Sequence, residues 1–318
     1  MSTKYLHERK DFSDLLRILE QETGILAYLI EKDYWIMHVL YGLKKMGLQF
    51  ELKGGTSLSK GHQIIHRFSE DIDLHIHPPK ELNVNTNPKK IKPNQVKSRK
   101  DYYDWLADYI VIDGIISVER DYVFDDKQHY RSGGIRLQYE SYTERVTGVK
   151  EGILLEVGFD TVTPNTPYTI SSWAFDKAVS TVGNDLIDNR AYDIVCYHSG
   201  YTFVEKLQTI ATKYRQEQER QIELPNLMRQ YYDIYCLLER KEVQEFIGTK
   251  RYFLHKLDRF PKKDYEIPMP ENEAFLLHSA EKRERFRQRY IETKALYYTE
   301  QPDFEVLLAR IAQYIDKL

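Results

Sequence analysis

The sequence has little of several features that would place it in a specialised class of protein. Its two cysteines among 318 residues are too few for a disulfide framework, which favours a reducing compartment. Glycine and proline number 15 and 11, which excludes a collagen-like or broadly disordered chain. No apolar run reaches the ~18 residues of a membrane span, and the first ten residues lack the apolar core of a signal peptide. We expect a soluble, cytoplasmic protein with no membrane partner.

The chain also lacks a strong net charge. With 46 Lys and Arg against 49 Asp and Glu, the formal net charge is −3. A phosphate-rich partner would therefore have to be held by a local patch. Hydrophobic residues make up 42% of the chain, which is enough to bury a large core in one large domain or two ordinary ones.

Hydrophobic spacing predicts an α+β part followed by a helical part. Helices are predicted over 11–46, broken at Gly24, and over about 102–112, and the polar stretch 83–100 is predicted to be a long mobile loop. Strands are predicted at 48–53, 71–77, 115–123, 134–139, 153–159 and 192–197. After Ser199 only helices are predicted, over 203–214, 227–238, 243–247, 273–290 and 304–315.

Lys53-Gly54-Gly55-Thr56-Ser57 is predicted to be a turn between a strand and a short helix. Glycines let the backbone approach a triphosphate closely, and a helix N-terminus offers free N–H groups to phosphate oxygens. Thr56 and Ser57 supply the side chains typical of an N-cap. A Gly-Gly pair before a helix is common, so this motif alone does not define a phosphate site.

Asp71 and Asp73 lie two residues apart in a strictly alternating segment. On a strand such residues share one face, and two neighbouring carboxylates repel each other unless a cation lies between them. Mg²⁺ suits such a pair when a phosphate supplies the remaining ligands. The alternative is a solvent-facing strand edge, where alternating Asp needs no function.

A third acid, Glu156, lies inside the apolar run 153–158. A carboxylate in so apolar a run needs a partner if it is buried. It could pair with an arginine such as Arg136, or it could complete a three-carboxylate metal site. Asp160 is the second candidate for that third carboxylate.

Taken in order, these motifs resemble the polymerase-β-like nucleotidyltransferase superfamily. Segments 52–58 and 67–74 are similar to the signature of the AbiEii/AbiGii toxin family, which includes the MenT-type toxins of bacterial toxin–antitoxin and abortive-infection systems. Segments 31–35, 203–207 and 229–235 resemble further parts of that family, so the likeness spans about residues 25–240. Cys236 is a departure, because relatives often have a second acid there.

The resemblance implies a polymerase-β-like nucleotidyltransferase domain with a mixed sheet flanked by helices over residues 1–198, followed by an α-helical bundle over 199–318. It implies an Mg²⁺-dependent enzyme, with Mn²⁺ as the alternative ion, that moves a nucleoside monophosphate from an NTP to an acceptor. The expected acceptor is tRNA, and the expected partner is a cognate antitoxin. The alternatives are transfer to a protein or small molecule, and a non-catalytic module that binds nucleotide or RNA.

The same resemblance, joined to the strand pattern, gives a set of candidate site residues. The nucleotide-binding candidates are Lys53, Gly54, Gly55, Thr56, Ser57, Arg67 and Ser69. The metal-binding candidates are Asp71, Asp73 and Glu156, and the catalytic candidates are Asp71, Asp73, Lys206 and Asp233. The helical bundle would supply Lys206, to neutralise the triphosphate, and Asp233, to orient Lys206 or assist the attacking hydroxyl. Arg67 and Ser69 could orient phosphates or cap the turn.

Two further patterns are ambiguous. His62, His66, His75 and His77 suggest zinc, but their spacing matches no standard zinc signature, so structural roles are favoured. Basic residues gather in segments 89–100 and 282–289. Each segment is either solvated surface or a contact for an RNA backbone.

Overall fold

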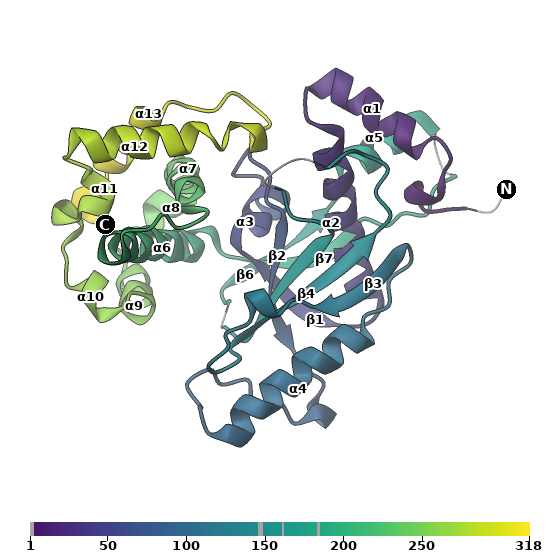
Figure 1. Cartoon of the computed structure of the whole chain (residues 1–318), viewed down its shortest axis with the longest axis horizontal. Coiled ribbons are helices and arrows are strands. Elements are labelled where there is room, and N and C mark those ends of the chain that lie inside the picture. Colours follow the sequence, from purple (N-terminus) through teal and green to yellow (C-terminus); the bar gives the residue numbers. More distant parts are fainter. Residues whose placement is uncertain (1–2, 146–148, 161, 183–184) are drawn as a thin grey trace. The chain divides into compact units, whose positions relative to one another are not determined.

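The computed structural model describes residues 3–145, 149–160, 162–182 and 185–318. The chain divides into two compact units (Figure 1). The sheet unit comprises Met1–His62 and Ser69–Tyr197, and the helical unit comprises Gln63–Phe68 and His198–Leu318. The short stretch Gln63–Phe68 thus belongs to the helical unit, although in sequence it lies between two parts of the sheet unit.

A seven-stranded mixed sheet forms the centre of the sheet unit. Its strands are β1 (Gln49–Lys53), β2 (Asp71–His77), β3 (Ile115–Arg120), β4 (Ser132–Tyr139), β5 (Ile153–Gly158), β6 (Asn165–Ile170) and β7 (Ala191–Tyr197). Their order across the sheet is β3-β4-β5-β2-β1-β7-β6. β2 pairs in parallel with β5 and antiparallel with β1. This order places the Asp-x-Asp strand between the glycine-turn strand and the strand that carries Glu156.

Two helices of the sheet unit cover one face of β4 and β5. The helices of this unit are α1 (Phe12–Thr23), α2 (Ala27–Lys45), α3 (Gly54–Thr56), α4 (Pro93–Tyr109) and α5 (Trp173–Val182). Trp35 of α2 stacks on Tyr139 of β4 with ring centroids 4.7 Å apart, and Tyr103 of α4 lies against Gly133. The register puts odd-numbered residues of β4 and β5 on this covered face. Glu156 therefore points to the opposite face.

The helical unit contains eight α-helices among its residues, all of which the structure describes. They are α6 (Ser199–Arg220), α7 (Leu227–Leu238), α8 (Lys241–Phe246), α9 (Lys250–Arg259), α10 (Lys262–Tyr265), α11 (Glu273–Leu276), α12 (Ala280–Ile291) and α13 (Phe304–Ala312). Phe203, Leu207 and Ile210 of α6 recur three and four residues apart and are fully buried. This periodicity gives α6 the apolar stripe that packs against α7 and α9.

The predicted fold class is confirmed: a mixed sheet with flanking helices is followed by a set of helices. All six predicted strands are present, and the helical stretch 11–46 divides into α1 and α2 around Gly24. Local periodicity is visible in elements such as α1 and β2, in which buried and less buried residues alternate with the period of a helix or a strand.

The prediction of a loop over 83–100 is wrong in its second half, since α4 begins at Pro93. Proline is favourable at the first helical position because its missing N–H has no partner there in any helix. The Lys92 N–H donates to Gln95 Oε1 at 3.1 Å and closes a capping box. The helix start was not predicted because the segment around Pro93 is polar and has no apolar periodicity.

Two elements of the sheet unit and one helix break did not follow from the pattern. β6 contains Pro167 and lies at the sheet edge, where a residue without an N–H is tolerated. α5 follows it at once. The predicted helix 273–290 is two helices, α11 and α12, because Leu277 adopts a left-handed φ of 45° between them.

Candidate active site

Three candidate residues lie side by side on the face of the sheet opposite α2 and α4. In the β1–β2 pair Lys53 is opposite Asp73, and in the β2–β5 pair Asp73 is opposite Glu156. Directly opposite residues on neighbouring strands project to the same face. The sheet therefore presents a cation and two carboxylates in one row, with Asp71 two residues along β2 on the same face.

The electrostatics of this row favour a bound cation. Burial, with smaller contributions from the negative charges of Asp73 and Asp71, raises the pKa of Glu156 to about 7. Asp71 Oδ1 is buried and has no hydrogen-bond partner among the described residues. A divalent cation with oxygen ligands would satisfy this atom and offset the repulsion. Asp71, Asp73 and Glu156 thus fit a magnesium site.

Arg136, the alternative partner of Glu156, pairs elsewhere. Its Nη2 lies 2.5 Å from Asp121 Oδ2, and its Nε donates to the same oxygen at 2.8 Å. On β5 the residue opposite Arg136 is Leu154. The structural interpretation of Glu156 as an Arg136 partner is therefore wrong.

Gly54 brings the turn against the Asp-x-Asp strand. Its φ is +67°, a conformation that L side chains rarely adopt. A Cβ at this position would lie 1.9 Å from Asp73 Oδ2, which is far inside van der Waals contact. Only glycine therefore allows the Asp73 carboxylate to rest against the turn.

Thr56 and Ser57 do not cap a helix, which corrects the predicted N-cap. The helix α3 begins at Gly54, and no side-chain cap is made at its start. Thr56 Oγ1 donates to the backbone carbonyl of Asp71, and Ser57 Oγ donates to the carbonyl of Gly54 at 3.0 Å. Both hydroxyls are fully buried and tie the turn to itself and to β2.

Lys150 and Lys32 are cations near the site that sequence reasoning missed. Lys150 Nζ lies 2.6 Å from Asp71 Oδ2, and the Lys150 N–H donates to Glu70 Oε2 at 2.8 Å. Lys32 Nζ lies 3.6 Å from Glu70 Oε2 and also donates to the Lys150 carbonyl. Burial lowers the pKa of Lys32 to about 8. Segment 31–35 carried a family likeness, but no signal marked Lys150.

A cavity of about 370 Å³ adjoins the row of charged side chains. It is lined by Lys53, Asp73, Asp126, Arg131, Ser132, Glu156, Val157, Gly158 and Asp160. Asp160 Oδ2 lies 3.7 Å from Lys53 Nζ, and Arg131 Nε lies 2.6 Å from Asp126 Oδ2. The cavity therefore combines carboxylates with two cations that could contact a phosphate.

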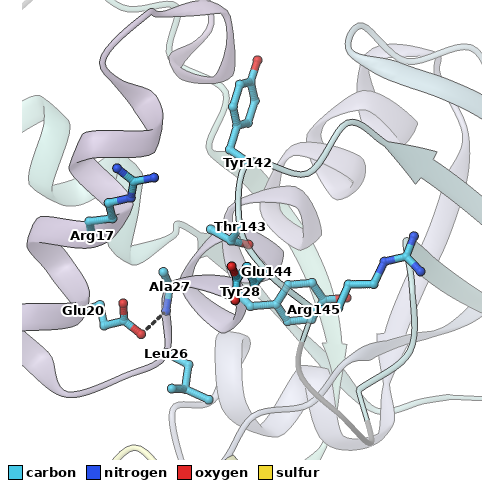
Figure 2. Close-up of a pocket in the computed structure, with 9 residues that line it drawn as sticks. All are labelled: Arg17, Glu20, Leu26, Ala27, Tyr28, Tyr142, Thr143, Glu144 and Arg145. Atoms are coloured by element: carbon cyan, nitrogen blue, oxygen red, sulfur yellow. Dashed lines mark hydrogen bonds between the residues drawn. The ribbon is translucent and has the colours of Figure 1, made fainter.

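A second cavity, of about 410 Å³, lies between segment 142–145 and residues of α1, α2 and the break between these helices (Figure 2). Figure 2 shows Glu20 beside Ala27, whose N–H donates to Glu20 Oε1 at 3.0 Å. None of its lining residues is a candidate site residue.

In the helical unit, three other candidates form a buried charge cluster. Arg67 donates to Asp233 through Nε at 2.7 Å and Nη2 at 2.6 Å, while Lys206 Nζ lies 2.6 Å from Asp233 Oδ2. Burial alone would raise the pKa of Asp233, but the charges of Arg67 and Lys206 hold it below its ordinary value. Asp233 therefore fixes the position of both cations. Arg67 Nη1 also donates to the backbone carbonyl of Phe68 at 3.0 Å, so this side chain does cap the turn before β2.

Replacing Asp233 with Asn is expected to destabilise the protein by about 3–5 kcal/mol, because two buried cations lose their shared counter-charge. Urea unfolding measures this loss. The control is Glu305→Gln, which removes an exposed pair with Arg283 (38% and 49% exposed) and should cost less than about 1 kcal/mol. Equal effects of the two substitutions would contradict the burial argument.

The raised pKa of Glu156 predicts how Mg²⁺ binding depends on pH. Its folded-state value of about 7 exceeds the ordinary 4.5, so the metal-free folded protein retains a proton that the unfolded chain has released. Without Mg²⁺, the free energy of unfolding should therefore fall as the pH rises from about 4.5 to about 7. Stabilisation by added Mg²⁺ should grow from about pH 6 to about pH 8, because binding requires the ionised carboxylate.

Thermal melts with and without Mg²⁺ across this pH range measure the effect. Glu156→Gln should abolish the pH dependence of the stabilisation by Mg²⁺. Glu151→Gln, which removes a carboxylate that pairs with Arg145 at the surface, should preserve this pH dependence. A pH-independent Mg²⁺ shift in the unsubstituted protein would show that Glu156 takes no part in binding.

Several basic residues of segment 89–100 are engaged within the protein. Arg99 is fully buried and donates to four backbone carbonyls, one of them that of His129 at 2.7 Å. Lys97 and Lys100 lie 2.5 and 2.8 Å from carboxylates of their own helix. Lys90 and Lys92 are exposed. The surface available to an RNA backbone is therefore narrower than the sequence suggested.

The basic residues of α12 are likewise mostly paired inside the helical unit. Arg289 donates to the buried carboxylate of Glu217 at 2.8 and 2.9 Å. Arg283 pairs with Glu305, and Arg287 with Glu284. The first interpretation of this helix, a surface of compensated charge, is the better supported one.

The structure thus packs the glycine turn against the Asp-x-Asp strand and places a third carboxylate on the adjoining parallel strand. The family model described as "Nucleotidyl transferase AbiEii toxin, Type IV TA system" matches residues 38–310. The chain belongs to this family. It is a nucleotidyltransferase of the toxin–antitoxin class, as the sequence motifs predicted.

Other comparisons add little. An antigenic nucleotidyltransferase-like protein from Paracoccidioides brasiliensis has a similar solved structure, with 15% sequence identity and a TM-score of 0.32. The similarity covers 73% of this chain and 94% of that one. The search of curated proteins gave no match. Within the described residues, no helix combines the length and apolarity needed to span a membrane.

Proposed function

We propose that the protein transfers a nucleoside monophosphate from an NTP to tRNA, with Mg²⁺ held by Asp71, Asp73 and Glu156. Mn²⁺ is the alternative ion. The observation that carries this proposal is the register that aligns Lys53, Asp73 and Glu156 across three neighbouring strands. A row of carboxylates on one face of the sheet, beside a cavity of about 370 Å³, suits a metal-bound triphosphate better than a structural ion pair.

The glycine turn, Lys53 and the bound metal ion would each act on the phosphates of the NTP. Because the Thr56 and Ser57 hydroxyls already donate to backbone carbonyls, and the Ser57 N–H donates to the Gly54 carbonyl, the turn would bind phosphates through backbone N–H groups of residues 54–56. Lys53 would neutralise phosphate charge from the neighbouring strand. A bound divalent cation would stabilise the negative charge that grows on phosphate oxygens.

Lys150 is a further cation that we assign to nucleotide binding. Its ammonium contacts Asp71 Oδ2 in the protein without ligand. A metal ion held by Asp71 Oδ1, the atom without a hydrogen-bond partner among the described residues, would share the carboxylate with this ammonium, so Lys150 would lie beside the metal-bound phosphates. Lys206 and Asp233 keep the roles that the family resemblance gives them: charge neutralisation by Lys206, oriented by Asp233.

The choice of tRNA rests on the family resemblance and on the exposed lysines of segment 89–92. A cognate antitoxin is the proposed protein partner, because the matched family is described as a toxin of a type IV system. We propose the cytoplasm as the place of action, since NTP and tRNA are both available there.

The test is transfer of label from each α-³²P NTP, with Mg²⁺, onto total tRNA and onto the protein itself. Label on tRNA that depends on Mg²⁺ and is absent with Asp73→Asn would support the proposal and name the nucleotide. Label on protein alone would replace tRNA with a protein acceptor. No label on either would contradict the tRNA acceptor and favour a small molecule or a non-catalytic binding module.

A further inference from the structure

Strand β2 carries a second set of metal-ligating side chains beyond the two aspartates. His75 and His77 continue the same face as Asp71 and Asp73, and Glu51 of β1 is directly opposite His75. One ligand atom from each of Glu51, His75 and His77 lies within 4.8 Å of the others. We propose that these three residues bind a first-row transition-metal ion, with Zn²⁺ as the preferred cation.

The three side chains already converge. His77 Nε2 lies 2.9 and 3.0 Å from the two carboxylate oxygens of Glu51, and His75 Nε2 lies 3.8 Å from Glu51 Oε2. The two imidazole rings meet edge to face, with centroids 4.7 Å apart. Both Nε2 atoms therefore approach one carboxylate, and small side-chain movements would place all three donors around one ion.

Burial gives this cluster a rigid base and an open side. Glu51 and His75 are 17% and 13% exposed, whereas His77 is 52% exposed. Two ligands are thus held by the sheet, and the third can adjust at the surface. Three protein ligands leave room for water or another oxygen donor, as in zinc sites with an open position.

The donor set decides which ion each site takes. Two imidazoles and one carboxylate suit zinc and its neighbours, whereas carboxylates alone suit Mg²⁺. Successive residues on one strand face are roughly 7 Å apart, so the histidine cluster is next to the aspartates but separate from them. The proposal does not depend on nucleotide transfer, because it concerns binding by the free protein.

The simpler interpretation is an ordinary His–Glu pair on a sheet surface. The chain offers a matched control in His278, which pairs with Glu273 through Nδ1 on the helical unit and is exposed. No second imidazole belongs to a metal-ligating group with that pair among the described residues. If a His–Glu pair alone sufficed for binding, both places would bind the ion.

The test is titration of metal-free protein with Co²⁺, followed by visible absorption, and with Zn²⁺, followed by calorimetry. With millimolar Mg²⁺ present to occupy the carboxylates of Asp71, Asp73 and Glu156, we expect one bound Co²⁺ ion that gives d–d bands and is not displaced by the Mg²⁺. His77→Ala and Glu51→Gln should each weaken binding at least about tenfold, and His278→Ala should not. Because His77 is exposed, its substitution should leave the thermal melt nearly unchanged, which the same samples can show.

Asp73→Asn separates this site from the proposed active site. It should abolish Mg²⁺-dependent transfer and leave the cobalt bands in place, so each proposal can fail without the other. The metal proposal is overturned if the unsubstituted protein binds no more Co²⁺ than His77→Ala, or if Asp73→Asn removes the bands. It is also overturned if Mg²⁺ at millimolar concentration displaces the cobalt.

Discussion

Asp73→Asn is expected to lower the rate of nucleotide transfer by roughly a hundred- to a thousandfold, the range seen when one electrostatic group is removed from an active site. Asp73 is the central member of the row, opposite Lys53 on one strand and Glu156 on the other. The amide keeps the shape of the side chain and removes its charge. Initial rates at saturating NTP and Mg²⁺ measure the effect.

Asp160→Asn is the matched control, and it also tests the choice of third carboxylate. Asp160 lines the same cavity and lies 3.7 Å from Lys53 Nζ, but it is 45% exposed and lies outside β5. Its substitution should cost less than about tenfold, because an exposed charge is screened by water. If Asp160→Asn were more harmful than Glu156→Gln, Asp160 would replace Glu156 in the metal site.

Gly54→Ala is expected to remove nearly all activity. The left-handed φ of +67° alone costs on the order of 1 kcal/mol for a residue with a Cβ. The larger effect is steric, since the new methyl group would lie 1.9 Å from Asp73 Oδ2. Either the turn or the Asp73 carboxylate must move, and both belong to the site. In Gly54→Ala, transfer assays should therefore show a large loss of activity, whereas thermal melts should show only a small loss of stability.

Gly47→Ala is the control for backbone strain. Gly47 has a similar φ of +82°, yet nothing lies within 4 Å of its added Cβ. It should lose a comparable small amount of stability and retain transfer activity. Full activity of Gly54→Ala, with a melt like that of Gly47→Ala, would show that the contact between the turn and Asp73 is dispensable.

Elements whose signal is local were predicted well. The alternation of 71–77 gives β2 with the same bounds in the structure, because period two on a half-buried strand is visible in seven residues. The helix 227–238 likewise matches α7. Segments that depend on distant partners were missed, such as the edge strand β6, which is defined by its pairing with β7.

The two histidines of β2 show that functional residues can also depend on partners far away in the sequence. His75 and His77 match no zinc spacing in sequence, since their third partner, Glu51, comes from another strand. Only the antiparallel register of β1 and β2 brings Glu51 opposite His75. A ligand set completed across a sheet cannot be recognised from the spacing of residues along one segment.

The sequence by itself determined the family, the glycine turn and the shared face of Asp71 and Asp73, because each follows from residues a few positions apart. Only the tertiary structure decided what surrounds them. It put Glu156 rather than Asp160 opposite Asp73, set Lys150 on Asp71 and enclosed Asp233 between Arg67 and Lys206. The physical reason is that strand register and burial are set by packing between segments far apart in the chain, which local periodicity does not encode.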